Sequence, residues 1–235
     1  MAPLPTVVLL PGLDGTATLF APLVKALAPT RCLPVAYPCD QLLGYDALEA
    51  LVRAGLPTKE PYVVVAESFS GPLGIRLAAA PPPGLAGVML VATFATSPVR
   101  IPAWVVRALA PMLASAPSPR SLVAPRLLGP TPPPALADAL MAAIHTVDPA
   151  VIALRQVAVL NVDVRPHLAN AMVPLGYLQA TRDRVVPARC SQSIQAVHPD
   201  LQLERIPGPH LLLQSEPRAC AAAIEAWWSS LYVPR

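Results

Sequence analysis

The sequence of 235 residues contains no cluster of lysine and arginine, and its net charge of +3 is small and spread along the chain. Only 2 of its 17 basic residues are lysines. Proteins that bind nucleic acid usually gather basic residues into a patch or stripe that contacts the phosphates. No nucleic-acid partner is therefore expected.

Long hydrophobic runs are also missing. No apolar stretch reaches about 18 uninterrupted residues, the length that predicts a membrane-spanning helix. The first apolar run, 7–10, is too short for the core of a signal peptide, and no positively charged region precedes it. We therefore expect no membrane span and a soluble, cytoplasmic protein.

The four cysteines show neither a C-x-x-C motif nor a spacing typical of metal sites. They are Cys32, Cys39, Cys190 and Cys220. Buried free thiols are the favoured interpretation, because free cysteine behaves as a small apolar side chain. A Cys32–Cys39 disulfide is the alternative.

Apolar residues make up 54% of the chain, enough for a substantial core in one domain or in one domain with an insertion. Apolar runs of strand length alternate with helix-forming stretches that are rich in alanine and leucine. Near-continuous apolar strands between helices predict an α/β fold, with a mostly parallel sheet of about six strands covered on both faces. The expected strands are 6–10, 32–37, 62–66, 86–92, 173–180 and 201–206, and the expected helices are 17–28, 45–55, 70–80, 187–197 and 217–230.

The alternation stops between residues 96 and 172, where twelve prolines separate short apolar pieces. This segment is too long for a loop in a compact domain. We expect a helical cap, 96–172, inserted into a core formed by 1–95 and 173–235. The alternative is a disordered proline-rich linker, which the helical periodicity of the apolar residues disfavours.

Ser68 follows the apolar run 61–65 and immediately precedes a helix-forming stretch. A sharp strand-to-helix turn holds a nucleophilic hydroxyl at the tip of a strand, and small residues are needed two positions before and after it. Ala66 and Ser70 occupy those positions, where glycine is usual. The alternative role for Ser68 is a simple helix N-cap.

An acid and a histidine follow later in the chain, each after its own expected strand. Asp183 follows the strand at 173–180, and His210 follows the strand at 201–206 in a loop rich in proline and glycine. A serine hydroxyl needs such a histidine to remove its proton, and the acid orients the imidazole. Asp163 is the alternative acid, and the alternative role of Asp183 is a surface ion pair. The other histidines, His145, His167 and His198, do not follow a strand.

Four segments together resemble the α/β-hydrolase superfamily over nearly the whole chain, and in particular its small bacterial serine esterases of the pimeloyl-carrier-protein methyl esterase and carboxylesterase type. These segments are Leu10–Gly15, Ala66–Gly71, Asp183–Pro187 and Gly208–His210. Many relatives have histidine before the first glycine of the first segment, and this chain has Pro11 there.

The resemblance implies a carboxylic-ester hydrolase that forms an acyl-enzyme on Ser68, with His210 and Asp183 completing a triad. The backbone N–H groups of Phe69 and, by resemblance, Leu13 would form the oxyanion hole. Asp14 is expected to shape its turn and Glu67 to point away from the site. Trp104, Met112 and Leu113 of the cap are candidates for an acyl pocket or for the cap's own core.

The expected partner is a small-molecule ester, with no metal or cofactor. A thioesterase, lactonase, acyltransferase or carbon–carbon hydrolase could use the same triad. A ligand-binding protein on this fold that has lost its chemistry is the alternative from another class, since fold alone does not fix function.

Overall fold

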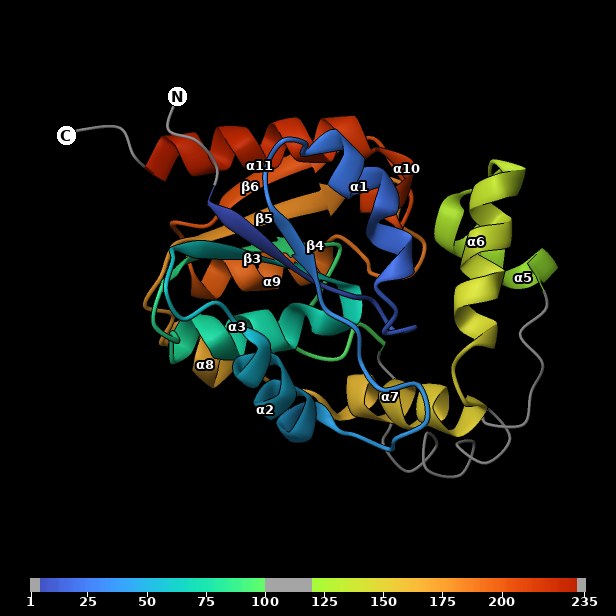
Figure 1. The fold of residues 1–235 in the computed structure, drawn as a ribbon, viewed down its shortest axis with the longest axis horizontal. Helices are drawn as coiled ribbons and strands as arrows, with labels where there is room; N and C mark the ends of the chain where they lie inside the picture. The colour runs from blue at the N-terminus through green and yellow to red at the C-terminus, as the bar shows by residue number, and fades with distance from the viewer. Residues whose placement is uncertain (1–4, 100–119, 232–235) are drawn as a thin grey trace.

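A computed structural model describes residues 5–99 and 120–231 and shows one six-stranded sheet (Figure 1). The strands lie in the order β2-β1-β3-β4-β5-β6, and every neighbouring pair is parallel. The expected sheet is confirmed. The strands are β1 (Thr6–Leu10), β2 (Cys32–Pro34), β3 (Tyr62–Glu67), β4 (Leu85–Val91), β5 (Leu175–Ala180) and β6 (Gln202–Ile206).

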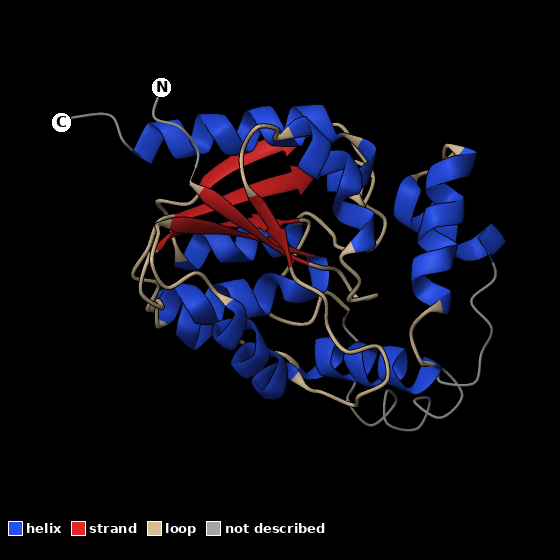
Figure 2. Cartoon of the chain, viewed as in Figure 1, coloured by secondary structure: helices blue, strands red, loops and turns tan. Residues whose placement is uncertain are grey.

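Helices cover both faces of the sheet (Figures 1 and 2). One face packs against α1 (Ala21–Ala26), α10 (Leu212–Ser215) and α11 (Pro217–Leu231). The other packs against α2 (Tyr45–Gly55), α3 (Gly71–Ala79), α8 (Arg165–Ala169) and α9 (Arg189–Val197). Two short 3-10 helices, η1 (Thr18–Phe20) and η2 (Ser68–Ser70), precede α1 and α3.

The central strand β3 shows why its sequence is a continuous apolar run. Val63 and Val65 pack into the core beneath α1 and α11, whereas Val64 and Ala66 pack into the core beneath α3. Successive side chains of a strand point to opposite faces, so a strand buried on both faces needs apolar residues at every position.

The segment between β4 and β5 contains four helices in its described part. They are α5 (Arg120–Leu128), α6 (Pro134–His145), α7 (Pro149–Asn161) and α8. The last of these packs on α3 and α9, next to the sheet. By contrast, α5 and α6 pack on each other and lie to one side of the sheet (Figure 1). Trp104, Met112 and Leu113 lie outside the described residues.

The cysteines differ in part from the expectation. All four are free, but only Cys190 and Cys220 are buried, while Cys39 is exposed and Cys32 is half-buried. Cys39 lies in the loop after β2.

Within the described ranges, no single helix has the length and hydropathy needed to cross a membrane. Helices α6 and α7 meet that criterion only when taken together, by length and composition, and they are bent by 97° at their junction.

Candidate active site

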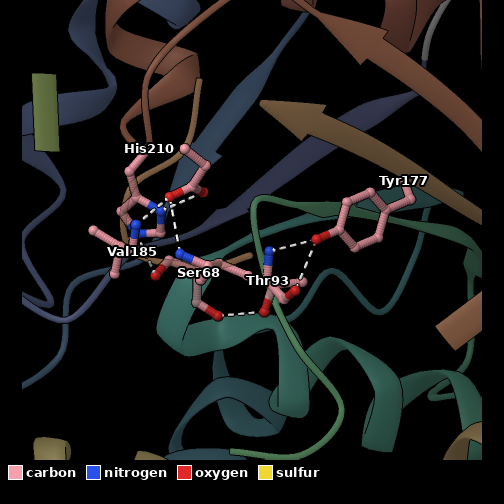
Figure 3. A network of polar contacts seen from close by, with 7 residues as sticks. Ser68, Thr93, Tyr177, Val185 and His210 are labelled. Atoms are coloured by element: carbon pink, nitrogen blue, oxygen red, sulfur yellow. Dashed lines mark hydrogen bonds and ion pairs between the residues drawn. The ribbon is translucent and has the colours of Figure 1, made fainter. Parts of the chain in front are cut away.

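Ser68 lies in the turn between β3 and α3, at the carboxyl end of the central strand. Its φ angle of 47° is in the left-handed region, which residues other than glycine rarely adopt. The Thr93 hydroxyl donates a hydrogen bond to the Ser68 carbonyl and holds this turn from the end of β4 (Figure 3). Such strained residues persist only where their surroundings hold them, and they gather at functional sites.

Tyr177 of β5 holds Thr93 in turn. Its hydroxyl accepts a hydrogen bond from the Thr93 N–H at 2.9 Å and donates one to the Thr93 carbonyl at 2.7 Å. Burial raises the pKa of Tyr177. Its phenol therefore stays protonated and keeps its donor role. Strands β3, β4 and β5 thus cooperate to hold one serine backbone.

The same turn accommodates Ala66 and Ser70 at the two positions where glycine is usual. A Cβ atom on Gly71 would lie 1.9 Å from the Thr93 hydroxyl oxygen, and a Cβ atom on Gly74 would lie 2.8 Å from the Ala66 Cβ. The close approach of helix to strand therefore depends on the two glycines of α3. Ser70 has an ordinary φ of −82°, so glycine is not needed there.

Ser68, His210 and Asp183 are joined by hydrogen bonds. The Ser68 Oγ lies 2.9 Å from the His210 Nε2, and the His210 Nδ1 lies 2.8 Å from the Asp183 Oδ2 (Figure 3). All three side chains are buried, with 8% of Ser68, 3% of His210 and 4% of the Asp183 side chain exposed. The structure thus brings together the three residues that the sequence singled out.

The Asp183 carboxylate is fixed at both oxygens. Its Oδ1 accepts the N–H groups of Val185 and Val186 at 2.7 and 2.9 Å, which leaves Oδ2 for the histidine. An aspartate that accepts from the Nδ1–H fixes the imidazole tautomer with a free Nε2. That nitrogen is the one facing Ser68.

The alternative acid is engaged elsewhere. Asp163 pairs with Arg165 at 2.5 Å, and 44% of its side chain is exposed. Hydrogen bonding to that arginine lowers the pKa of Asp163. The structure therefore brings Asp183, and not Asp163, to His210.

The loop after β1 forms a tight turn beside Ser68. The Gly15 N–H donates to the Gly12 carbonyl at 3.0 Å, and the Asp14 carboxylate accepts the N–H and hydroxyl of Thr16. Asp14 shapes this turn, as expected. The Ser70 hydroxyl donates to the Pro11 carbonyl and ties the loop to the turn that carries Ser68.

The two expected oxyanion donors are backbone groups on either side of Ser68. Phe69 lies in the first turn of a helix, where N–H groups have no carbonyl partner within the helix. Leu13 lies in the loop after β1, and its N–H has no acceptor among the described residues. Tyr45 fixes Phe69 by stacking on its ring, with centroids 4.9 Å apart, and by donating to its carbonyl at 3.0 Å.

Glu67 lies on the α10 side of the sheet, where the Gln214 amide donates to it at 3.1 Å. Only 2% of the residue is exposed, and burial, with a contribution from the charge of Asp14, raises the pKa of its carboxyl to about 8. At neutral pH this residue is therefore mostly a neutral acid beside Ser68.

Sequence reasoning missed Arg155 of α7. Only 1% of it is exposed, and it donates to three backbone carbonyls in the loops after β1 and β2. The one signal in the sequence is that Arg155 is the only charged residue between Asp148 and Asp163, in a mostly apolar helix.

Two surface depressions lie away from Ser68. One, of about 640 Å³, lies between β6 and α11, and the other, of about 530 Å³, lies between α2 and α7. Neither is lined by Ser68, Asp183 or His210. In residues 5–99 and 120–231, no three histidine, cysteine, aspartate or glutamate side chains are grouped as a metal site.

Similar solved structures share this fold at low sequence identity. An enol-lactonase from Burkholderia xenovorans LB400 has a TM-score of 0.76 and 20% identity over 96% of this chain and 92% of its own. An esterase from Thermogutta terrifontis has a TM-score of 0.81 and 18% identity over 97% and 90%. A bromoperoxidase from Bacillus anthracis has a TM-score of 0.77 and 14% identity over 95% and 91%. At these identities the likeness shows the fold alone.

A search among curated proteins finds no sequence match. The model of the alpha/beta hydrolase family matches residues 7–223, which is nearly the whole chain. The chain belongs to the alpha/beta hydrolase family.

Proposed function

We propose that this protein is a serine hydrolase that cleaves carboxylic esters of small molecules through an acyl-enzyme intermediate. The observation that carries the proposal is the unbroken series of hydrogen bonds from Ser68 through His210 to Asp183. It starts at a strained turn at the end of β3, where the fold presents a hydroxyl.

In the acylation step, the Ser68 Oγ attacks the ester carbonyl carbon while the His210 Nε2 accepts the hydroxyl proton. The Asp183 carboxylate stabilises the resulting imidazolium through the Nδ1–H. The carbonyl oxygen becomes an oxyanion in a tetrahedral intermediate. When that intermediate collapses, the C–O bond to the alcohol breaks, and His210 gives its proton to the departing alcohol oxygen.

The oxyanion needs donors that are already in place. We assign this role to the backbone N–H groups of Leu13 and Phe69, which lie on the two segments that flank Ser68. Preorganised donors stabilise the transition state without reorganisation, and loss of one such donor lowers turnover by about 10²–10³-fold in comparable sites.

In the deacylation step, water loses a proton to His210 and attacks the acyl carbonyl. The second tetrahedral intermediate collapses with return of the proton to the Ser68 Oγ, which releases the carboxylic acid. In each step His210 takes a proton from one oxygen and returns it to another. The protons therefore balance, with water as the only added reactant.

We further propose that the part of the segment 96–172 before α8 is a cap on the core formed by 1–95 and 173–235, to which α8 is added because it packs on α3 and α9 beside the sheet. The support comes from its contacts with the loops of the site. The Leu211 N–H, next to His210, donates to the Leu127 carbonyl of α5 at 2.9 Å. Leu19 and Leu211 join α5 and α6 in an apolar cluster with Leu128 and Leu140.

Lactone hydrolysis is the second candidate, because a lactone is a cyclic ester and its cleavage uses the same steps. A protein named as an enol-lactonase has the same fold, so a lactone belongs in the substrate panel. A panel of p-nitrophenyl esters of increasing acyl length, a thioester and a lactone separates the substrate classes. We expect the p-nitrophenyl esters to be the fastest substrates.

Ser68→Ala tests the nucleophile. We expect it to abolish ester hydrolysis in a folded protein and to prevent labelling by a fluorophosphonate probe, which the wild type should take up at Ser68. Ser193→Ala in α9 is the matched control and should be labelled like the wild type. Normal turnover by Ser68→Ala would overturn the proposal, and a wild type that neither hydrolyses nor is labelled would favour a binding protein.

A further inference from the structure

Arg155 reaches from α7 into the base of the loop that carries Leu13. Its Nη1 donates to the carbonyls of Leu13 and Asp14 at 3.0 and 2.8 Å, and its Nη2 donates to the Pro38 carbonyl at 2.9 Å. One guanidinium therefore joins α7 to the loop after β1 and to the loop after β2.

The loop is built around this guanidinium. A Cβ atom on Gly15 would lie 2.4 Å from the Arg155 Nη1, and Gly15 has a φ of 72°. Only glycine fits the space and adopts that backbone conformation easily. The Tyr37 ring lies below the guanidinium, whose central carbon is 5.7 Å from the ring centroid.

Stability alone does not account for an arginine at this place. Burying a cation is costly unless it is paired. Burial lowers the pKa of Arg155, and the charge of the nearby Asp14 carboxylate offsets this effect only in part. The Arg155 Nε also has no hydrogen-bond partner among the described residues. What the guanidinium provides is a rigid fork of donors that fixes several carbonyls at once.

The peptide carbonyls of the turn Gly12–Gly15 determine where the Leu13 N–H points. The Gly12–Leu13 peptide is planar and trans, so its C=O and N–H point in opposite directions. The Gly12 carbonyl accepts the Gly15 N–H at 3.0 Å, which turns the Leu13 N–H away from Gly15. Arg155 fixes the next two peptides of the same turn by binding the carbonyls of Leu13 and Asp14.

Tyr37, whose ring lies against the Arg155 guanidinium, connects Arg155 to the turn that carries Ser68. The Tyr37 hydroxyl lies 2.6 Å from the Ser70 Oγ, and Ser70 donates to the Pro11 carbonyl. The Tyr37 N–H donates to the Gly15 carbonyl at 2.8 Å. The loop of Leu13 is therefore held between Arg155 on one side and the turn of Ser68 on the other.

We propose that Arg155 is a positioning residue that sets the Leu13 N–H in the oxyanion hole and makes its geometry depend on the docking of α7. This inference rests on the proposed ester hydrolysis. The guanidinium touches neither substrate nor Ser68, and it acts through the turn Gly12–Gly15.

The test compares Arg155→Met with Arg53→Met. Arg53 of α2 also donates to a backbone carbonyl, that of Ala80, but away from the site. We expect Arg155→Met to lower kcat and kcat/KM for p-nitrophenyl butyrate by the same factor, about 10- to 100-fold, because an interaction made only in the transition state is lost. The Ki of phenylboronic acid, which forms a tetrahedral adduct on serine, should rise by a similar factor.

Arg155→Lys keeps the charge but has no fork, and we expect a loss of about 3- to 10-fold with KM unchanged. If Arg155→Met does not fold, Arg155→Lys is compared with Arg53→Met instead. The proposal is overturned if the folded variants lose no more activity than Arg53→Met, or if KM rises while kcat and the boronate Ki stay the same.

Amide exchange separates this inference from the proposed function. In a Ser68→Ala background, where no chemistry occurs, Arg155→Met should speed exchange of the Gly15 and Tyr37 N–H groups at least about 10-fold while amides of β3 keep their protection. Unchanged exchange at Gly15 contradicts the positioning role. A wild type without esterase activity contradicts only the proposed function.

Discussion

At the scale of single residues, the site consists of polar groups that would be costly to bury one by one. An unpaired polar group in the interior typically costs about 1–3 kcal/mol. Asp183 removes that cost by accepting from two backbone N–H groups and from His210. Because each group satisfies the next, loss of one member leaves its neighbour unpaired as well as removing the catalytic role proposed for it.

We predict that His210→Ala lowers kcat for p-nitrophenyl butyrate by at least about 10³-fold and that Ser68→Ala combined with it lowers kcat no further, since triad members act as a unit. Asp183→Asn should also be severe, because an amide stabilises the wrong imidazole tautomer. Asp163→Asn is the matched control. If that variant is the impaired one, the acid is assigned wrongly.

The buried Glu67 carboxyl should make the stability of the protein depend on pH. Burial raises the pKa of its carboxyl from 4.5 to about 8 in the folded protein. Between these values the folded state binds more protons than the unfolded state, so the contribution of Glu67 is fully present below about pH 4.5 and is lost as pH rises toward 8. Stability should therefore decline over this range and then level off.

Glu67→Gln removes that titration. Relative to the wild type it should gain stability from pH 5 to 8, by at most about 5 kcal/mol, because one pKa unit corresponds to about 1.4 kcal/mol. Urea midpoints at pH 5, 7 and 9 measure the difference. Burial also raises the pKa of Asp14, but that residue is present in both proteins. Parallel pH dependences in the two proteins would contradict the assignment.

At the scale of elements, the sequence predicted every strand, and the differences lie at the ends. The second strand was expected at 32–37 but ends at Pro34. The Val35 N–H still donates to the Leu9 carbonyl of β1, and the chain then turns to the loop after β1, where the Tyr37 N–H donates to the Gly15 carbonyl. The first helix was expected at 17–28 but is split into η1 and α1. Pro22 lies in the first turn of α1, where proline is favoured.

The site was predictable to the extent that it follows the order of the strands. Ser68, Asp183 and His210 each follow a strand of a parallel sheet, and such strands end at the same edge. Arg155 follows no strand. Its position depends on how α7 docks against two distant loops, and a single charge within α7 does not show in the sequence which loops it contacts.

The proposed cap predicts control of acyl-chain length. We expect Trp104→Ala, Met112→Ala or Leu113→Ala to shift the preferred acyl length while the acetyl ester is still hydrolysed, because shorter side chains leave more room for the chain. Leu122→Ala is the matched control, since Leu122 lies on α5 and is 69% exposed. Chain-length profiles for the four variants give the result.

Unchanged profiles in all three variants, with only the free energy of unfolding altered, would mean that these residues form the cap's own core. The outcome bears on substrate selection alone. The hydrogen bonds among Ser68, His210 and Asp183 involve none of these residues.

At the scale of the whole molecule, the sheet separates two apolar cores, and the proposed chemistry lies at one end of it. The core beneath α11 depends on close contact between that helix and neighbouring strands. Trp227 packs over Gly87 of β4 and Gly176 of β5. Gly87 and Gly176 lie near the amino ends of β4 and β5, whereas Ser68, Asp183 and His210 follow the carboxyl ends of their strands. Changes beneath Trp227 should therefore affect stability more than chemistry.

Gly87→Ala tests this separation. A Cβ atom there would lie 2.8 Å from the Trp227 ring and 3.2 Å from the Pro174 carbonyl oxygen, and the ring is 95% buried and has little room to move. We expect a loss of about 1–3 kcal/mol, as for other overpacked cores. Gly55→Ala, with open space around it at the end of α2, should be neutral or slightly stabilising.

Urea unfolding should show a lower midpoint for Gly87→Ala with an unchanged slope, since the slope reports the surface exposed on unfolding. The kcat of the folded variant should stay within about twofold of the wild type. A fall in kcat that matches the loss of stability would instead mean that the packing beneath α11 and the geometry at Ser68 are coupled through the sheet.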